Sequence, residues 1–221
     1  MSWSRPCFKG FAKVVMGDSS IRAFGRKKRQ LRGMSITGFG GMDLLEAICI
    51  LQAGKISLDC DIGRCKIRNR FQNGKDEFPT IRFCKHCYGE CMSTFEGQFI
   101  LVVGLNNSLK ADIEPFANEY GRSLQDVDGM FALLDNVLQK MLPKAEIKLA
   151  PVLYVGNEAW RASQLKQNIF RNFNECITAR NHLQMDPNEP YRRNLYDFDG
   201  VHMNDYQSIE FWTKTFMQED E

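Results

Sequence analysis

The sequence contains no long apolar run. No stretch of it approaches the ~20 consecutive apolar residues that a membrane-spanning helix needs. The first residues, Met1 to Cys7, also lack the apolar core of a secretory signal peptide. We therefore expect an intracellular, cytoplasmic protein without a membrane span. In that compartment the eight cysteines would be thiols or metal ligands rather than disulfides.

Histidine is also scarce, with three residues in the chain: His86, His182 and His202. Only His202 follows an acid at a short, useful spacing, because Asp199 lies three residues before it. A carboxylate placed in this way can orient an imidazole and stabilise its charged form, as a general base requires. His202 is therefore the candidate base, and Asp199 is its candidate partner.

The composition has no extreme that would exclude a globular enzyme. The chain has 221 residues, of which 43% are hydrophobic and 25% are charged, and its net charge is +2. This length fits one α/β domain. Such a domain buries roughly 70% of its unfolded surface, so it needs neither disulfides nor a metal to hold its core.

Short apolar strands alternate with amphipathic helices along most of the chain. This alternation predicts a parallel sheet with helices on both faces, which is a three-layer α/β/α fold. The expected strands cover residues 12–16, 34–37, 99–103 and 147–155, and the expected helices cover 42–52, 129–141, 165–183 and 204–217.

One polar segment, at about residues 55–98, interrupts this alternation and carries five of the eight cysteines. Connections in α/β folds usually span only a few residues. We therefore expect one domain over residues 1–221 with an inserted cysteine-rich lobe. The lobe would contain a β-hairpin or a similar small unit built on Ile56–Leu58 and Thr80–Phe83.

Two of the expected strands end in polar turns. The first runs into Gly17-Asp18-Ser19, and the third runs through Gly104 into Asn106. Open α/β sheets place reacting groups at the carboxyl ends of their strands, and a serine there can act as a nucleophile if a base activates it. Gly38 ends the second expected strand.

These serine, glycine, asparagine and Asp-x-x-His pieces resemble, in this order, the four sequence blocks of the SGNH (GDSL-type) esterase/lipase family. The resemblance implies a flavodoxin-like strand order and a serine hydrolase mechanism. It implies Ser19 as nucleophile, with Asp199 and His202 as the other members of a triad. It also implies an oxyanion hole formed by the backbone N–H groups of Ser19 and Gly38 and the side-chain amide of Asn106. Gly40 and Gly41 lie in the same turn as Gly38 and are alternatives to it.

The sequence departs from the family pattern at two places. Ser20 follows the nucleophile where leucine is usual, and Asn107 stands where the family usually has an aspartate. No implied catalytic residue is missing. The resemblance therefore favours an esterase acting on a small ester or acylated substrate without a catalytic cofactor.

Two cysteine pairs in the insertion have the spacing of zinc ligands, Cys60-x4-Cys65 and Cys84-x2-Cys87. Cys91 or His86 could replace one of the four. We expect a structural zinc ion here, with free thiols or a redox disulfide as the alternatives.

A basic run over residues 22–32 supports a different function. Domains similar to SGNH hydrolases also occur in RNA-associated and retrotransposon proteins, where they bind RNA or a protein partner without turnover. Clustered basic residues suit phosphate contacts, although a solvated surface or a nuclear-import signal would have the same composition. The run consists of Arg22, Arg26, Lys27, Lys28, Arg29 and Arg32.

Overall fold

The computed structural model describes residues 3–4, 8–21, 33–53, 81–82, 90–109, 111 and 126–217. Within them, four parallel strands form one sheet in the order β3-β2-β5-β6. The strands are β2 (Lys13–Gly17), β3 (Met34–Gly38), β5 (Gln98–Val102) and β6 (Glu146–Ala150). The predicted parallel α/β sheet is confirmed.

The direction in which the chain winds reverses between β2 and β5. After β2 the chain moves to β3 on one side, and it then crosses to β5 and β6 on the other. Open α/β sheets bind their ligands at such a switch point, outside the carboxyl ends of the strands. By this rule we expect a functional site beyond Gly17 and Val102, which pair with each other in the sheet.

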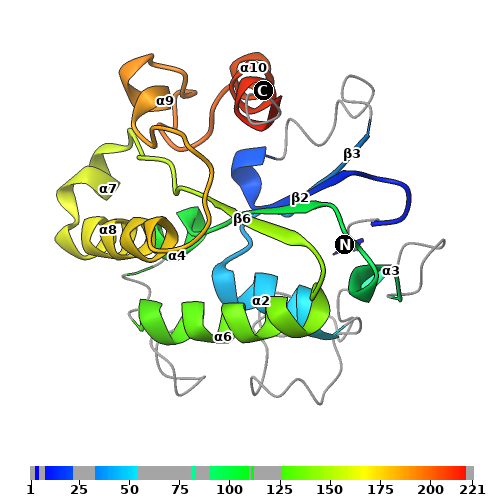
Figure 1. Ribbon diagram of the computed structural model, residues 1–221. Helices are drawn as coiled ribbons and strands as arrows, with labels where there is room; N and C mark the ends of the chain where they lie inside the picture. Colours follow the sequence, from blue (N-terminus) through cyan, green and yellow to red (C-terminus); the bar gives the residue numbers. More distant parts are fainter. Residues whose placement is uncertain are drawn as a thin grey trace, which may run out of the picture.

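Alternate side chains of the strands pack into two separate cores, as the two-residue period of a strand requires. Val14 and Met16 belong to a core with the helices α2 (Leu44–Ala53), α6 (Val127–Met141) and α8 (Gln164–Thr178). Val15 belongs to the other core, with α10 (Asp205–Met217). Figure 1 shows α2 and α6 on one face of the sheet and α10 on the opposite face. The fold therefore has three layers, α/β/α.

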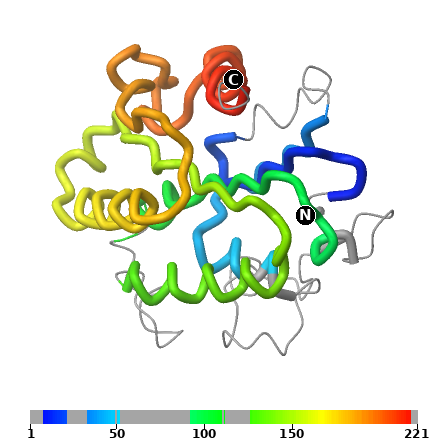
Figure 2. Tube along the Cα trace, in the orientation of Figure 1, coloured from blue at the N-terminus to red at the C-terminus, as the bar shows by residue number. Residues whose placement is uncertain are grey.

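The last helix, α10, packs against the segment that follows β2. In Figure 2 the red C-terminal helix lies above the blue segment that follows β2. The blue segment is the short 3-10 helix η1 (Ser19–Ile21). The indole of Trp212 on α10 donates a hydrogen bond to the carbonyl of Ser20 at 2.9 Å. This contact joins residues almost two hundred positions apart.

Two elements are shorter in the structure than the sequence predicts. The predicted strand 147–155 stops at Ala150, because Pro151 has no N–H to continue the ladder. The predicted helix 165–183 ends at Thr178. Residues beyond it run alongside β6, where Leu149 donates to the carbonyl of Asn181 and accepts from the N–H of Leu183.

Several short helices were not anticipated from the sequence. They are η1, α4 (Leu105–Leu109), α7 (Glu158–Ala162) and α9 (Glu189–Arg192). Each is five residues or shorter, so it has too few turns for a hydrophobic period to be recognised.

The structure describes little of the predicted insertion. A strand forms at β4 (Ile81–Arg82), and α3 (Glu90–Ser93) follows it. The partner of β4 is β1 (Trp3–Ser4), and the pair is parallel rather than a hairpin. The other half of the expected hairpin, Ile56–Leu58, lies outside the described residues.

Candidate active site

The serine turn begins where β2 and β5 are in closest contact. A Cβ atom on Gly17 would lie 2.8 Å from both the Cβ atom and the carbonyl oxygen of Val102, so only glycine fits there. The N–H of Asp18 then donates to the carbonyl of Val102 at 3.0 Å. Ser19 is the next residue and is half-buried. It is therefore placed directly beyond the sheet, at the switch point.

Asp18 ties the serine turn to the neighbouring strand end. Its carboxylate is 1% exposed and accepts from the N–H of Ser20 at 2.9 Å and from the N–H of Leu105. Burial raises its pKa to about 6, although the hydrogen bonds from Ser20 and Leu105 and the charge of His202 act in the opposite direction. The Asp18 carboxylate therefore links the serine turn to the start of α4.

Asp199 and His202 form a close pair. The ring Nδ1 of His202 lies 2.7 Å from Asp199 Oδ2. The backbone N–H groups of Val201 and His202 donate to Asp199 Oδ1 at 2.8 and 2.9 Å. Because Nδ1 faces the carboxylate, we assign the proton to Nδ1, so that Nε2 is the nitrogen able to accept a proton.

The electrostatics of Asp199 suit an orienting acid. Partial burial raises its pKa, but the hydrogen bonds from His202 and Val201 outweigh this effect, and the pKa is lowered overall. Asp199 is thus ionised at neutral pH. The side chains of His202 and Asp199 are 48% and 38% exposed, so the pair is accessible to a substrate.

The hydroxyl of Ser19 and the ring of His202 do not hydrogen-bond to each other in this structure. They are nonetheless held on adjoining segments, because α10 starts three residues after His202 and packs on η1. The Ser208 hydroxyl and the Trp212 indole of α10 both donate to the carbonyl of Ser20. Catalytic hydrogen bonds are often long in ligand-free sites and shorten when the substrate binds.

Asn106 is nearly buried on α4, and one N–H of its amide donates to the carbonyl of Met42 at 3.1 Å. This bond fixes the direction of the amide, and an amide nitrogen carries a second N–H that can serve a ligand. Asn107 has a different role, because its Oδ1 accepts from the N–H of Leu44 at 2.9 Å at the start of α2. The residue that departs from the family pattern therefore caps a helix.

Gly38 ends β3 and pairs with Gly17. The N–H of the next residue, Phe39, donates to the carbonyl of Gly17 at 2.8 Å. Successive N–H groups of a strand point in opposite directions, so that of Gly38 points away from β2. Gly41, farther along the same turn, has a φ of 73°. Ser19, Gly38 and Asn106 thus all lie at the carboxyl edge of the sheet, beyond three adjacent strands.

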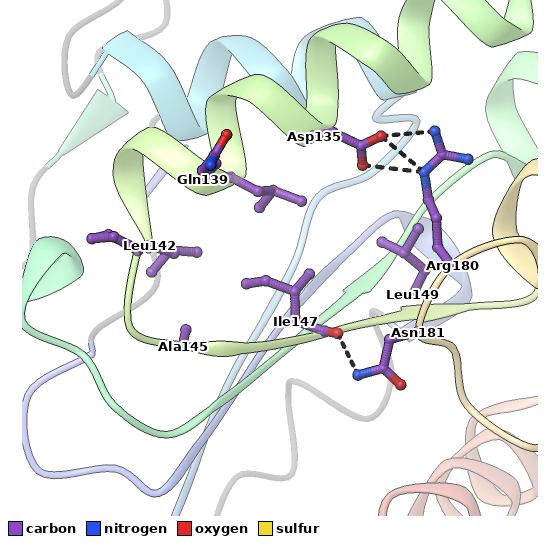
Figure 3. Close-up of a pocket in the computed structure, with 10 residues that line it drawn as sticks. Asp135, Gln139, Leu142, Ala145, Ile147, Leu149, Arg180 and Asn181 are labelled. Carbon is purple, nitrogen blue, oxygen red and sulfur yellow. Dashed lines mark hydrogen bonds and ion pairs between the residues drawn. The ribbon is translucent and has the colours of Figure 1, made fainter.

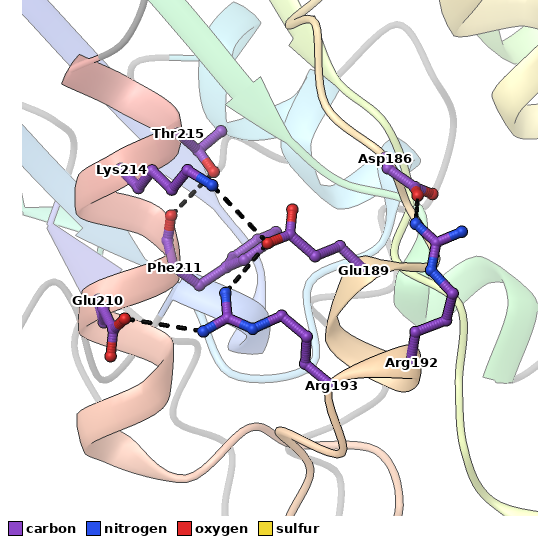
Figure 4. A network of polar contacts seen from close by, with 8 residues as sticks. All are labelled: Asp186, Glu189, Arg192, Arg193, Glu210, Phe211, Lys214 and Thr215. Atoms are coloured by element: carbon purple, nitrogen blue, oxygen red, sulfur yellow. Dashed lines mark hydrogen bonds and ion pairs between the residues drawn. The ribbon is translucent and has the colours of Figure 1, made fainter.

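Salt bridges brace the ends of the segment that carries Asp199 and His202. Figure 4 shows Arg193, just after α9, reaching Glu189 and also Glu210 of α10. The nitrogen–oxygen distances are 3.0 and 3.7 Å. Lys214 lies 4.0 Å from Glu189, and Arg192 pairs with Asp186. Each exposed pair contributes little alone, but the Arg193–Glu210 and Lys214–Glu189 pairs connect the α9 region to α10 on either side of the turn.

A separate pocket of about 330 Å³ lies between α6 and β6. Figure 3 shows its apolar lining, with Leu142 and Ile147, and the ion pair between Arg180 and Asp135 at one end. The guanidinium and carboxylate of that pair are 2.7 Å apart. None of the candidate catalytic residues lines this pocket.

The predicted zinc ligands and basic run are not described. Cys60, Cys65, Cys84, His86 and Cys87 lie outside the described residues, as do the side chain of Cys91 and all of residues 22–32. The part of the chain that is described contains no group of three or more His, Cys, Asp or Glu able to hold a metal. Structural zinc and RNA contact by the basic run therefore stay predictions. Nor does any described helix have the length and apolar character to cross a membrane.

Comparison with known proteins gives a likeness in fold. No protein-family model and no curated protein matches the sequence. Among solved structures, the acetyl xylan esterase AlAXEase superposes with a TM-score of 0.51 at 14% identity, covering 93% of this chain and 98% of that one. The chain has the SGNH hydrolase fold.

Two further structures show the same likeness. A member of the lipolytic G-D-S-L family from Veillonella parvula has a TM-score of 0.51 at 12% identity, covering 95% of this chain and 98% of that one. A lipase/acylhydrolase from Enterococcus faecalis has a TM-score of 0.50 at 10% identity, covering 95% of each chain. Both superpositions extend over most of this chain.

Proposed function

We propose that this protein is a serine esterase that cleaves a carboxylic ester through an acyl-Ser19 intermediate. The observation that carries the proposal is the Asp199–His202 pair, with 2.7 Å between the carboxylate and the ring. The pair precedes the helix that packs on the Ser19 turn. It occurs in a fold shared with proteins described as an acetyl xylan esterase and a lipase/acylhydrolase.

In the proposed acylation step, Nε2 of His202 takes the proton of the Ser19 hydroxyl as Oγ bonds to the ester carbonyl carbon. The ionised Asp199 stabilises the resulting imidazolium. The carbonyl oxygen becomes an oxyanion, which accepts from the N–H of Ser19, from the amide of Asn106 and from a backbone N–H of the turn that ends β3. The Gly38 N–H points away from β2, so Gly40 or Gly41 in the same turn is the alternative donor. When the tetrahedral intermediate collapses, the alcohol leaves with the proton from His202.

Deacylation repeats this chemistry with water. His202 takes a proton from the water as its oxygen bonds to the acyl carbon, and the proton then returns to Ser19 Oγ as the carboxylic acid departs. On the protein side, these steps use the side chains and backbone N–H groups of this chain, and water is the second reactant. Because the Asp199–His202 pair is half-exposed, an ester carried by another molecule can reach it.

The test is labelling with a fluorophosphonate together with hydrolysis of a short aryl ester. Ser19→Ala should remove both activities, and Ser19→Ala/His202→Ala should be little worse, because triad residues act as a unit. Ser20→Ala is the matched control, since it removes the adjacent hydroxyl and should keep the label. Undiminished hydrolysis by Ser19→Ala would overturn the proposal.

A further inference from the structure

The turn that carries Asp199 rests on the loop that follows β6. The N–H of Gly156 donates to the carbonyl of Gly200 at 2.8 Å. The side-chain amide of Asn157 donates to the carbonyl of Asp199 at 3.0 Å. Gly200 has a φ of 64°, and a Cβ atom on it would lie 2.7 Å from the nitrogen of Asn157. Glycine is thus required for both the conformation and the close contact.

Asn157 is itself held in a defined orientation. It is the N-cap of α7, where its Oδ1 accepts from the N–H of Trp160 at 3.2 Å. Trp160 is buried and donates from its indole to the Ser108 hydroxyl. With its oxygen fixed by the cap, the amide must direct its Nδ2 donor to one place, which is the Asp199 carbonyl.

The acid–base turn also has other supports, among them the hydrogen bond from the Tyr196 hydroxyl to the carbonyl of Tyr154 and the burial of Met203 in the core beside α10. Its internal hydrogen bonds run from Asp197 N–H to the carbonyl of His202 at 2.7 Å and from Gly200 N–H to the carbonyl of Asp197 at 2.9 Å. These bonds fix the shape of the turn but not its position on the protein. Since both functional side chains are substantially exposed, the contacts with Gly156 and Asn157 contribute to that position.

We propose that Asn157 is a positioning residue for the acid–base pair, aligning Asp199 and His202 with the Ser19 turn through its hydrogen bond to the Asp199 carbonyl. This inference rests on the proposed function. It separates two roles of one side chain, because Oδ1 caps α7 and Nδ2 holds the turn. A substitution that keeps the first role and loses the second tests it.

Asn157→Ser keeps a neutral side chain that caps helices well, and Asn157→Ala keeps neither role. Ser163→Ala is the matched control, since Ser163 caps α8 nearby through the N–H of Lys166. In the full chain, with an aryl ester, both Asn157 variants should lower kcat about tenfold with KM unchanged, because misplacement of reacting groups costs rate. Ser163→Ala should lower Tm and keep kcat.

The pH profile gives a second measurement. In both Asn157 variants the acid limb of kcat/KM should move to lower pH, because a displaced Asp199 stabilises the charged ring less. If Asn157→Ser keeps the wild-type kcat and acid limb, Asn157 only caps α7 and the inference is overturned. If instead the wild-type protein neither hydrolyses esters nor labels at Ser19, the proposed function fails, and the inference fails with it.

Discussion

Asp18 directly follows β2 and Asp199 lies in the turn before α10, and the surroundings of these two carboxylates differ. Asp18 is 1% exposed, and burial raises its pKa to about 6. The side chain of Asp199 is 38% exposed, and its hydrogen bonds from His202 and Val201 lower its pKa despite partial burial. Two residues of the same type thus have different roles because of their positions. Asp18 connects two strand ends, whereas Asp199 is suited to orient a base.

The largest effect should follow from removing the charge of the exposed carboxylate. Asp199→Asn leaves the shape of the turn intact but can no longer stabilise a charged His202 ring or fix its tautomer. We expect hydrolysis of an aryl ester to fall about 10³-fold or more, with little change in Tm, because the side chain is partly exposed. Steady-state kinetics and a thermal melt check this. A large fall in Tm with normal turnover would show that Asp199 stabilises the fold and does not orient the base.

The adjacent residues Asn106 and Asn107 provide the next test. Asn106→Ala should lower kcat about 10²–10³-fold, as the loss of one oxyanion donor does. Asn107→Ala removes the buried cap of α2 and should lower the free energy of unfolding by about 1–3 kcal/mol. Kinetics and urea unfolding on both variants separate the two roles. Equal losses of turnover would show that both residues act only through the packing of this edge.

The effect expected from Asp18 concerns stability as a function of pH and not turnover. Its pKa is raised in the folded protein from an ordinary 3.8 to about 6, so the folded state binds the proton more tightly than the unfolded state. The contribution of this group to stability is therefore largest below about pH 4 and declines as pH rises through about 6. The loss reaches about 3 kcal/mol, since each pKa unit corresponds to about 1.4 kcal/mol.

Asp18→Asn lacks this titration. The difference in unfolding free energy, wild type minus variant, should therefore decrease between pH 4 and pH 7. Urea denaturation at several pH values measures it, and the direction of the change does not depend on the baseline cost of the substitution. Parallel stability curves for the two proteins would show that Asp18 does not titrate in this range.

Most of the layered fold could be predicted from local patterns. The apolar run ending in Gly17 and the helical period from Gly129 to Met141 both correspond to elements of the structure. The predicted ends of elements were wrong where a tertiary contact or a proline ends the element. The strand at 146–150 stops before Pro151, and α8 ends at Thr178 so that the following residues can pair beside Leu149.

The sequence by itself determined which residues carry reactive groups and in which order they occur. Ser19, Asn106 and the Asp199–His202 pair could be proposed as site residues because their order and spacing resemble the sequence blocks of a known family. Only the tertiary structure decided the burial of Asp18, the contact of Trp212 with Ser20, and the hydrogen bond from Asn157 to Asp199. The physical reason is that these contacts join segments distant in sequence, so no local period or motif encodes them, and they form only when the sheet and helices pack.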